Sequence, residues 1–143
     1  MNVLVLHGPN LNLLGEREPH LYGHATLVEL DAIIAARAKE LGLAVRIYQS
    51  NHEGSLIDFL QSERKWAEGV LLNAGALTHY SWALHDALTA TSLPFVEVHL
   101  SDVMKRETWR HFSVFEGNRK ALFSGKGVDS YLEGLAFLAA LRK

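Results

Sequence analysis

Residues 2–10 read NVLVLHGPN, a short aliphatic run followed by the polar sequence HGPN. The aliphatic part, Asn2–Leu6, is apolar on both alternating faces. Runs of this kind are typical of strands buried on both sides in a parallel sheet. Open α/β sheets bind ligands beyond the carboxyl ends of their strands, so the polar end of this segment marks a candidate site.

Similar aliphatic runs recur along the chain and alternate with segments of helical periodicity. Further strands are predicted over residues 43–48, 69–72, 94–98 and 122–123, and helices over residues 27–41, 55–67, 82–91 and 129–142. Thr26 and Glu29 form a capping box at the start of the first helix, and Gly42 stands where a C-terminal glycine belongs. Ser55 and Ser81 are the predicted caps of the next two helices.

This alternation predicts βαβ units, in which right-handed crossovers leave few topologies open. We expect an α/β, flavodoxin-like three-layer sandwich, with a five-stranded parallel sheet in the order 2-1-3-4-5 and helices on both faces. No repeat or linker interrupts the pattern, so residues 1–143 are predicted to form a single domain.

The composition of the chain excludes several classes of protein. The 143 residues are 48% hydrophobic and 21% charged, which excludes a disordered chain. The sequence has no apolar run of about 20 residues, as a membrane span requires, and no signal peptide pattern. A net charge of −2 argues against a nucleic-acid partner, and the absence of cysteine excludes disulfides and thiolate metal sites. We expect a cytoplasmic protein without a membrane partner.

Polar side chains follow each of the first four predicted strands. Beyond the first strand they lie within residues 50–54, 73–79 and 97–102, and the ends of parallel strands meet at one edge of the sheet. Neither GxxxxGK[ST] nor GxGxxG after the first strand is present, so a nucleotide cradle is not expected. The HExxH motif of zinc sites is also missing, and we do not expect a metal. The pattern favours a small polyhydroxylated or carboxylated ligand.

Residues 14–23, LGEREPHLYG, form an unusually long connection after the first strand. Strand-to-helix connections usually have about 2 to 6 residues, and longer ones at this edge commonly act as lids. Arg17 and Tyr22 lie on this segment, where both can fold over the predicted site.

A series of motifs runs along the chain: Gly8–Gly15, Arg17–Pro19, Tyr22–Gly23, Gln49–Gly54, Asn73–Ala76, Thr78–His79, Asp86–Ala87, Glu97–Ser101, Arg106–Glu107 and Arg110–His111. These segments closely resemble the signature of type II 3-dehydroquinate dehydratase. They occur in order over nearly the whole chain. The resemblance implies the flavodoxin-like fold and the dehydration of 3-dehydroquinate to 3-dehydroshikimate with no cofactor and no metal.

The resemblance assigns the catalytic groups residue by residue. Tyr22 would remove a proton from C2 of the substrate. A phenol in water ionises only near pH 10, so a nearby cation is needed to favour its ionised form, and Arg17 is the expected cation. Asn10 would stabilise the enolate that forms. His99 would give a proton to the departing C1 hydroxyl, and Glu97, on the same strand face, would hold its imidazole.

The resemblance also assigns binding groups and an assembly. The expected substrate ligands are Asn73, His79, Leu100, Ser101 and Arg110, with Arg110 on the carboxylate. In the family the residue matching Asp86 reaches the site of a neighbouring subunit, and twelve subunits assemble as four trimers. A homododecamer is therefore expected. Of the remaining polar residues, His7 is expected to support the site from behind, and Arg106 to pair with a carboxylate of the lid.

Five positions depart from the family pattern: Leu77, Asp102, Met104, Lys105 and Ser130. The family often has Tyr, Asn, His, Ala and Gly there, respectively. None of the five removes a matched catalytic group. Asp102 would add negative charge near the carboxylate pocket. The departures at residues 102–105 would also alter the packing of the loop that carries Arg106.

Two alternatives stay open. One is a flavodoxin-like module that binds flavin or another small ligand without catalysis, although the hydroxyl-rich phosphate loop of such modules is missing. The other is a dehydratase that forms an imine with lysine, for which Lys105 is the nearest candidate. For the dehydratase, a biosynthetic role and a role in quinate breakdown are both compatible with the sequence.

Overall fold

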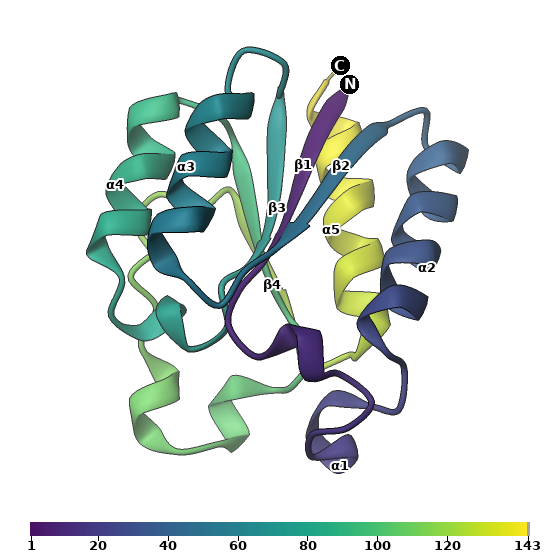
Figure 1. The fold of residues 1–143 in the computed structure, drawn as a ribbon, viewed down its shortest axis with the longest axis vertical. Helices are drawn as coiled ribbons and strands as arrows, with labels where there is room; N and C mark the ends of the chain where they lie inside the picture. The colour runs from purple at the N-terminus through teal and green to yellow at the C-terminus, as the bar shows by residue number, and fades with distance from the viewer. Residues whose placement is uncertain (143) are drawn as a thin grey trace.

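The computed structural model describes residues 1–142, which build one sheet of five parallel strands in the order β2-β1-β3-β4-β5 (Figure 1). The strands are β1 (Asn2–His7), β2 (Ala44–Gln49), β3 (Gly69–Asn73), β4 (Phe95–His99) and β5 (Ala121–Ser124). The helices are α1 (Pro19–Tyr22), α2 (Leu27–Glu40), α3 (Glu53–Glu63), α4 (Trp82–Thr91) and α5 (Val128–Leu141). Four short 3₁₀ helices complete the described elements: η1 (Leu11–Leu13), η2 (Gly75–His79), η3 (Val103–Lys105) and η4 (Thr108–His111). The predicted fold class and strand order are confirmed.

Helices cover both faces of the sheet, with α2 and α5 on one side and α3 and α4 on the other (Figure 1). Alternation along β1 explains its sequence: Val3 and Val5 face α2 and α5, whereas Leu4 and Leu6 face α3. Full burial of one such side chain stabilises the fold by about 1.5–3 kcal/mol. The sequence of β1 is therefore apolar on both faces because both faces are covered.

The same alternation sorts the polar residues at the strand ends. His7 has the same parity along β1 as Val3 and Val5, so its side chain faces α5. Asn73 on β3 pairs in register with His7, and its side chain faces the same side of the sheet. Glu97 and His99 have the opposite parity to Val96 and Val98, which face α5. The site therefore draws on both faces of the sheet.

Most predicted helix ends are confirmed. The Thr26 hydroxyl accepts a hydrogen bond from the Glu29 N–H at 3.2 Å, Gly42 has a φ of 73°, and the Ser81 hydroxyl accepts from the Leu84 N–H. The predicted start of α3 at Ser55 is wrong. The helix begins two residues earlier, because the carbonyl of His52 already accepts from the Leu56 N–H.

Other boundaries also differ from the predictions. Helix α3 ends at Glu63 rather than Ala67, because the Arg64 N–H bonds to the Gln61 carbonyl and the backbone passes into a turn. Strand β4 begins at Phe95, after the predicted Pro94. On α5 the buried stripe contains Tyr131, Leu135 and Leu138, whereas Leu132 and Ala136 are only partly buried. No helix within residues 1–142 is long and apolar enough to cross a bilayer.

Candidate active site

A cavity of about 80 Å³ lies at the carboxyl ends of β1, β3 and β4. Most of the predicted site residues line it: Asn10, Arg17, Tyr22, Asn73, His99, Leu100, Ser101 and Arg110. A second cavity of about 240 Å³ shares His99 and Arg110 with the first, and Glu97 and His79 line it. The structure thus gathers the predicted residues around two adjoining hollows.

Close packing of the backbone brings the ends of β1 and β3 together beneath the cavity. The Gly8 N–H donates to the Asn73 carbonyl at 2.7 Å, and a Cβ on residue 8 would lie 2.4 Å from the Ala74 carbonyl oxygen. Only glycine fits there. Asn10 follows with a φ of 70°, a left-handed conformation that asparagine tolerates, and its N–H donates to the Asn51 side chain.

Two guanidinium groups hold the Tyr22 hydroxyl. Arg17 Nη2 donates to it at 2.9 Å and Arg106 Nη1 at 2.6 Å. The Arg17 guanidinium also stacks over the phenol ring, 4.1 Å from its centroid. Hydrogen bonds from cations stabilise negative charge on the acceptor. The phenol of Tyr22 is therefore surrounded by the groups that a phenolate would need.

Arg106 is the functional residue that sequence reasoning missed. The expectation that it pairs with a carboxylate of the lid is wrong, because its guanidinium bonds to the hydroxyls of Tyr22 and Ser101. The available signal was its position five residues after Ser101, within a matched motif. That spacing alone does not indicate which way a side chain in irregular backbone points.

The imidazole of His99 is held by Glu97. His99 Nε2 lies 2.6 Å from Glu97 Oε2, and the other carboxylate oxygen accepts from Ser113 and Arg119, each at 2.8 Å. Burial alone would raise the pKa of Glu97, but the hydrogen bond and charge of His99, together with the Arg119 and Ser113 bonds, outweigh it and hold that pKa below its usual value. An ionised Glu97 orients the imidazole with Nδ1 as its remaining nitrogen.

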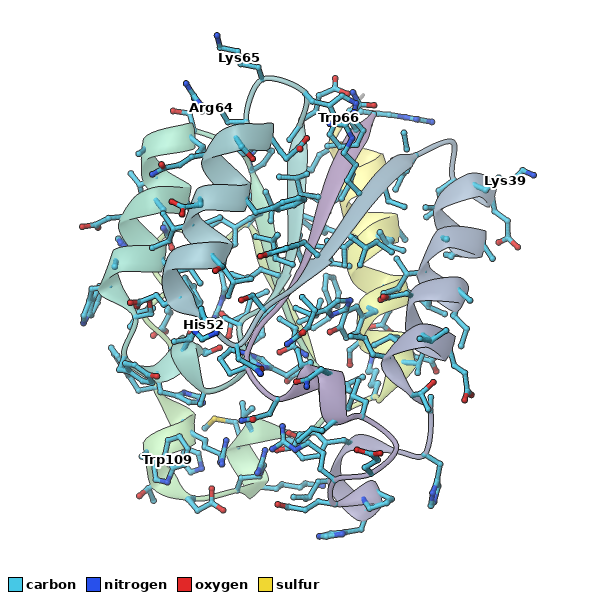
Figure 2. The ribbon with its side chains drawn as sticks, viewed as in Figure 1. Lys39, His52, Arg64, Lys65, Trp66 and Trp109 are labelled. Carbon is cyan, nitrogen blue, oxygen red and sulfur yellow. The ribbon has the colours of Figure 1, made fainter. Side chains whose placement is uncertain are left out.

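The predicted binding residues divide between the two cavities. Leu100 and Ser101 are buried in the wall of the first. Arg110 borders both, ion-paired with Glu107 and stacked on the Trp109 ring. Figure 2 shows Trp109 in the segment beyond the carboxyl ends of the strands. A cation thus stands where the two cavities adjoin.

His79 and Asp86 lie apart from the first cavity. His79 Nδ1 donates to the Phe112 carbonyl at 2.6 Å, and burial lowers the pKa of this histidine. It borders only the second cavity. Asp86 on α4 is exposed, bonded to His85, and lines neither cavity. Within one chain, Asp86 is therefore not brought to the site.

The departures from the family pattern occupy structural positions. The Asp102 side chain accepts from the Met104 N–H and caps η3, and it borders neither of the two cavities but a separate hollow that Tyr22 and Lys105 also line. Leu77 is buried in the core and Ser130 accepts from the Lys126 N–H. The expected effect of Asp102 on the carboxylate pocket is not supported by this placement.

The donor set of the cavity does not suit a metal or an imine. Among residues 1–142, no three His, Asp or Glu side chains are grouped so as to hold a metal ion. None of the lysines in that range lines either cavity, and Figure 2 shows Lys39 and Lys65 at the opposite end of the molecule. The polar lining consists of guanidinium, phenol, imidazole, amide and hydroxyl groups.

An α/β sheet that presents a cation-bound phenol beside an imidazole–carboxylate pair defines an enzyme that moves protons on a small anionic molecule. The family model described as "Dehydroquinase class II" matches residues 1–139. The chain belongs to this family, as the resemblance of its motifs indicated.

Relatives and solved structures agree with the family match. The chain is 52% identical over 135 residues to a 3-dehydroquinate dehydratase of Dictyoglomus turgidum, covering 94% of this chain and 93% of that protein. It is 46% identical over 130 residues to "Catabolic 3-dehydroquinase 1" of Aspergillus fumigatus, covering 91% and 87%. The crystal structure of a type II dehydroquinase from Butyrivibrio crossotus superposes with a TM-score of 0.94 at 41% identity, covering 96% and 97%.

Proposed function

We propose that this dehydroquinase converts 3-dehydroquinate to 3-dehydroshikimate and water by anti elimination through an enolate. Tyr22, as phenolate, takes the C2 proton, and the electron pair of that C–H bond moves onto the C3 carbonyl oxygen. The enolate then re-forms the ketone and expels the C1 hydroxyl, which takes a proton from His99 and leaves as water. A proton passes from Tyr22 back to His99 through solvent, so the enzyme ends unchanged.

The observation that carries this proposal is the contact of two guanidiniums with the Tyr22 hydroxyl. A phenol becomes an effective base near neutral pH only where its ionised form is stabilised. Arg17 and Arg106 supply two charge-assisted hydrogen bonds to that form. Asn10, which borders the same cavity, would stabilise the enolate oxygen directly or through a water.

The acid side of the reaction rests on His99 and Glu97. A carboxylate bonded to one imidazole nitrogen fixes the orientation of the ring and aims the other nitrogen. The buried Glu97 carboxylate does this from within the sheet. Arg119 and Ser113 in turn hold the carboxylate, so the imidazole is fixed before substrate arrives.

The remaining site residues would bind the substrate. Arg110 matches a carboxylate because its guanidinium offers paired N–H donors. Asn73, Ser101 and the backbone of Leu100 would contact hydroxyls, with His79 reaching the substrate from the second cavity. Asp86 would act on the site of a neighbouring subunit, which requires the homododecamer.

The wider setting belongs to the same proposal. Residues 1–143 would form a single catalytic domain that works in the cytoplasm, in aromatic biosynthesis or in quinate breakdown. Light scattering after size-exclusion chromatography should give twelve times the chain mass of 15.9 kDa. A trimer or monomer at working concentration would contradict the assembly.

The decisive experiment mixes purified protein with 3-dehydroquinate. Near-ultraviolet absorbance should rise as the conjugated enone forms, and protein without substrate is the blank. No rise at high enzyme concentration would overturn the proposal. Sodium borohydride added with substrate should leave the enzyme active, because an enolate route forms no imine; trapping on Lys105 would contradict the mechanism.

A further inference from the structure

A buried chain of polar groups lies behind Asn73, on its side away from the cavity. It contains Tyr131 of α5, His7 of β1 and Asp31 of α2. Tyr131 and His7 are fully buried, and Asp31 reaches the surface with 31% of its side chain exposed. The catalytic steps proposed above use none of these three residues.

The hydrogen bonds that link these buried groups all run in one direction, from Asn73 as first donor to Asp31 as last acceptor. Asn73 Nδ2 donates to the Tyr131 hydroxyl at 2.9 Å, and that hydroxyl lies 3.0 Å from His7 Nδ1. Burial raises the pKa of Tyr131, so the group stays a phenol with one proton to give. His7 Nδ1, at 3.0 Å, is the acceptor in reach of that proton.

The direction continues to the surface through the other ring nitrogen. With Nδ1 as acceptor, a neutral imidazole carries its proton on Nε2. His7 Nε2 lies 2.8 Å from Asp31 Oδ1, a carboxylate oxygen that can only accept. Each of these three contacts, from Asn73 to Asp31, thus joins a donor to an acceptor.

This series of hydrogen bonds determines the orientation of the Asn73 amide. Asn73 Oδ1 accepts from the Gly75 N–H at 3.2 Å. A flipped amide would set its NH₂ against the Gly75 N–H and would take the Tyr131 proton from His7, leaving buried groups unpaired. An unpaired buried polar group costs about 1–3 kcal/mol. Within residues 1–142 the second N–H of Asn73 has no hydrogen-bond partner, and the residue lines the cavity.

We propose that Tyr131, His7 and Asp31 are positioning residues that hold the Asn73 amide in one orientation, so that the cavity offers an N–H donor to a substrate oxygen. This inference rests on the proposed function for the identity of the substrate. It assigns the three residues to substrate affinity rather than to the chemical step.

Tyr131→Phe removes one hydroxyl and keeps the ring. We expect the KM for 3-dehydroquinate to rise about tenfold, because about one hydrogen bond to the substrate is lost. The kcat should stay within about twofold of the starting value. In an Asn73→Ala background, Tyr131→Phe should change KM by less than about twofold, while its cost in stability persists. An unchanged KM, or an effect that survives in the Asn73→Ala background, would overturn the proposal.

Asp31 provides a test that leaves the buried residues intact. Asp31→Ala removes the acceptor for His7 and allows the imidazole proton to move to Nδ1, which reverses the chain. Asp31→Asn keeps an acceptor oxygen. We expect KM to rise about threefold in the alanine variant and to stay unchanged in the asparagine variant. Equal effects in both would contradict a positioning role.

A readout without turnover separates this inference from the proposed function. The side-chain ¹⁵N amide signals of Asn73, assigned from their loss in Asn73→Ala, should shift in Tyr131→Phe and Asp31→Ala. They should stay in place in Leu138→Ala, a core change on the same helix. An inactive parent protein with these shifts would defeat only the proposed function. Signals that do not move would defeat the positioning role.

Discussion

The two walls of the candidate active site, which spans both cavities, are held in place in different ways. Asn73, Glu97 and His99 form the rear wall and belong to β3 and β4, and all three are at least 94% buried. Arg17, Tyr22 and Arg106 form the front wall and lie on connections, partly exposed. The rear wall bonds to groups deep in the protein, whereas the front wall bonds mainly to itself.

This difference separates stability from activity. A buried polar group that loses its partner destabilises the whole fold. The front-wall contacts join three partly exposed side chains, so little of the fold depends on them. Changes in the front wall should therefore reduce turnover alone, and changes in the rear wall should reduce both turnover and stability.

The largest expected effect comes from removing the front-wall phenol. Tyr22→Phe should lower kcat by about 10³, because proton removal by a positioned base contributes about 10²–10⁴ in rate. The ring is retained, so the melting temperature should change by less than about 1 °C. The enone assay and calorimetry measure the two quantities. Tyr48→Phe, at a partly buried ring stacked on Phe59, is the control and should leave kcat unchanged.

If Tyr22→Phe lowered the melting temperature markedly as well as kcat, the proposed difference between the two walls would be contradicted. Full turnover in this variant would show that the base is another group. Binding of the product, measured by calorimetric titration, should stay within about twofold, since the hydroxyl acts in the chemical step.

The second effect tests the rear wall through stability. Glu97→Gln should lower the free energy of unfolding at neutral pH by about 3 kcal/mol, because His99 and Arg119 lose their buried anion. The pKa of Glu97 is lower in the folded protein than in the unfolded chain. Its contribution is therefore present above the unfolded pKa and is lost as the pH falls through the folded one.

Urea unfolding at several pH values from neutral to acid measures this contribution. The gap between the parent and Glu97→Gln should narrow as the pH falls below the usual range of a glutamate. Glu40→Gln, which breaks an exposed pair with Arg37, should change stability by less than about 0.5 kcal/mol at every pH. A gap that is the same at neutral and acid pH would contradict the ionised, paired state of Glu97.

The third effect returns to the front wall. Arg106→Lys keeps the charge but loses the planar donor that reaches both Tyr22 and Ser101, so kcat/KM should fall about 10- to 100-fold. The melting temperature should stay close to that of the parent. Arg37→Lys on the surface is the matched control. If the lysine variant retains full activity, the second guanidinium on Tyr22 is dispensable.

The same two walls differ in how far they could be predicted. The rear wall follows from strands: runs apolar on both faces locate β1, β3 and β4, and their polar ends converge by topology. Parity along β4 places Glu97 beside His99, two residues away. The expected pairing of these two side chains is confirmed at 2.6 Å.

The front wall and the buried support depend on tertiary contacts that no local pattern encodes. Arg106 meets Tyr22 across 84 residues of sequence, through irregular backbone whose path hydrophobic periodicity does not set. Tyr131 meets Asn73 across 58 residues, and its place on α5 resembles that of any core aromatic. Likewise, Ser55 has the residue type of a cap, but the backbone of His52 begins α3 earlier.

The smallest expected effect sharpens the rear wall. Ser113 donates one of the three hydrogen bonds that Glu97 accepts, and its own oxygen also accepts from the Phe115 N–H. Ser113→Ala should lower the free energy of unfolding by about 1 kcal/mol and kcat by less than about tenfold, because His99 and Arg119 still hold the carboxylate. Ser62→Ala, at an exposed hydroxyl bonded to Phe59, should change neither quantity. A loss of stability with unchanged kcat would mean that the orientation of His99 tolerates a less constrained Glu97. A loss of kcat as large as that of Glu97→Gln would mean that this one hydroxyl, rather than the charge of Arg119, determines the geometry of the rear wall.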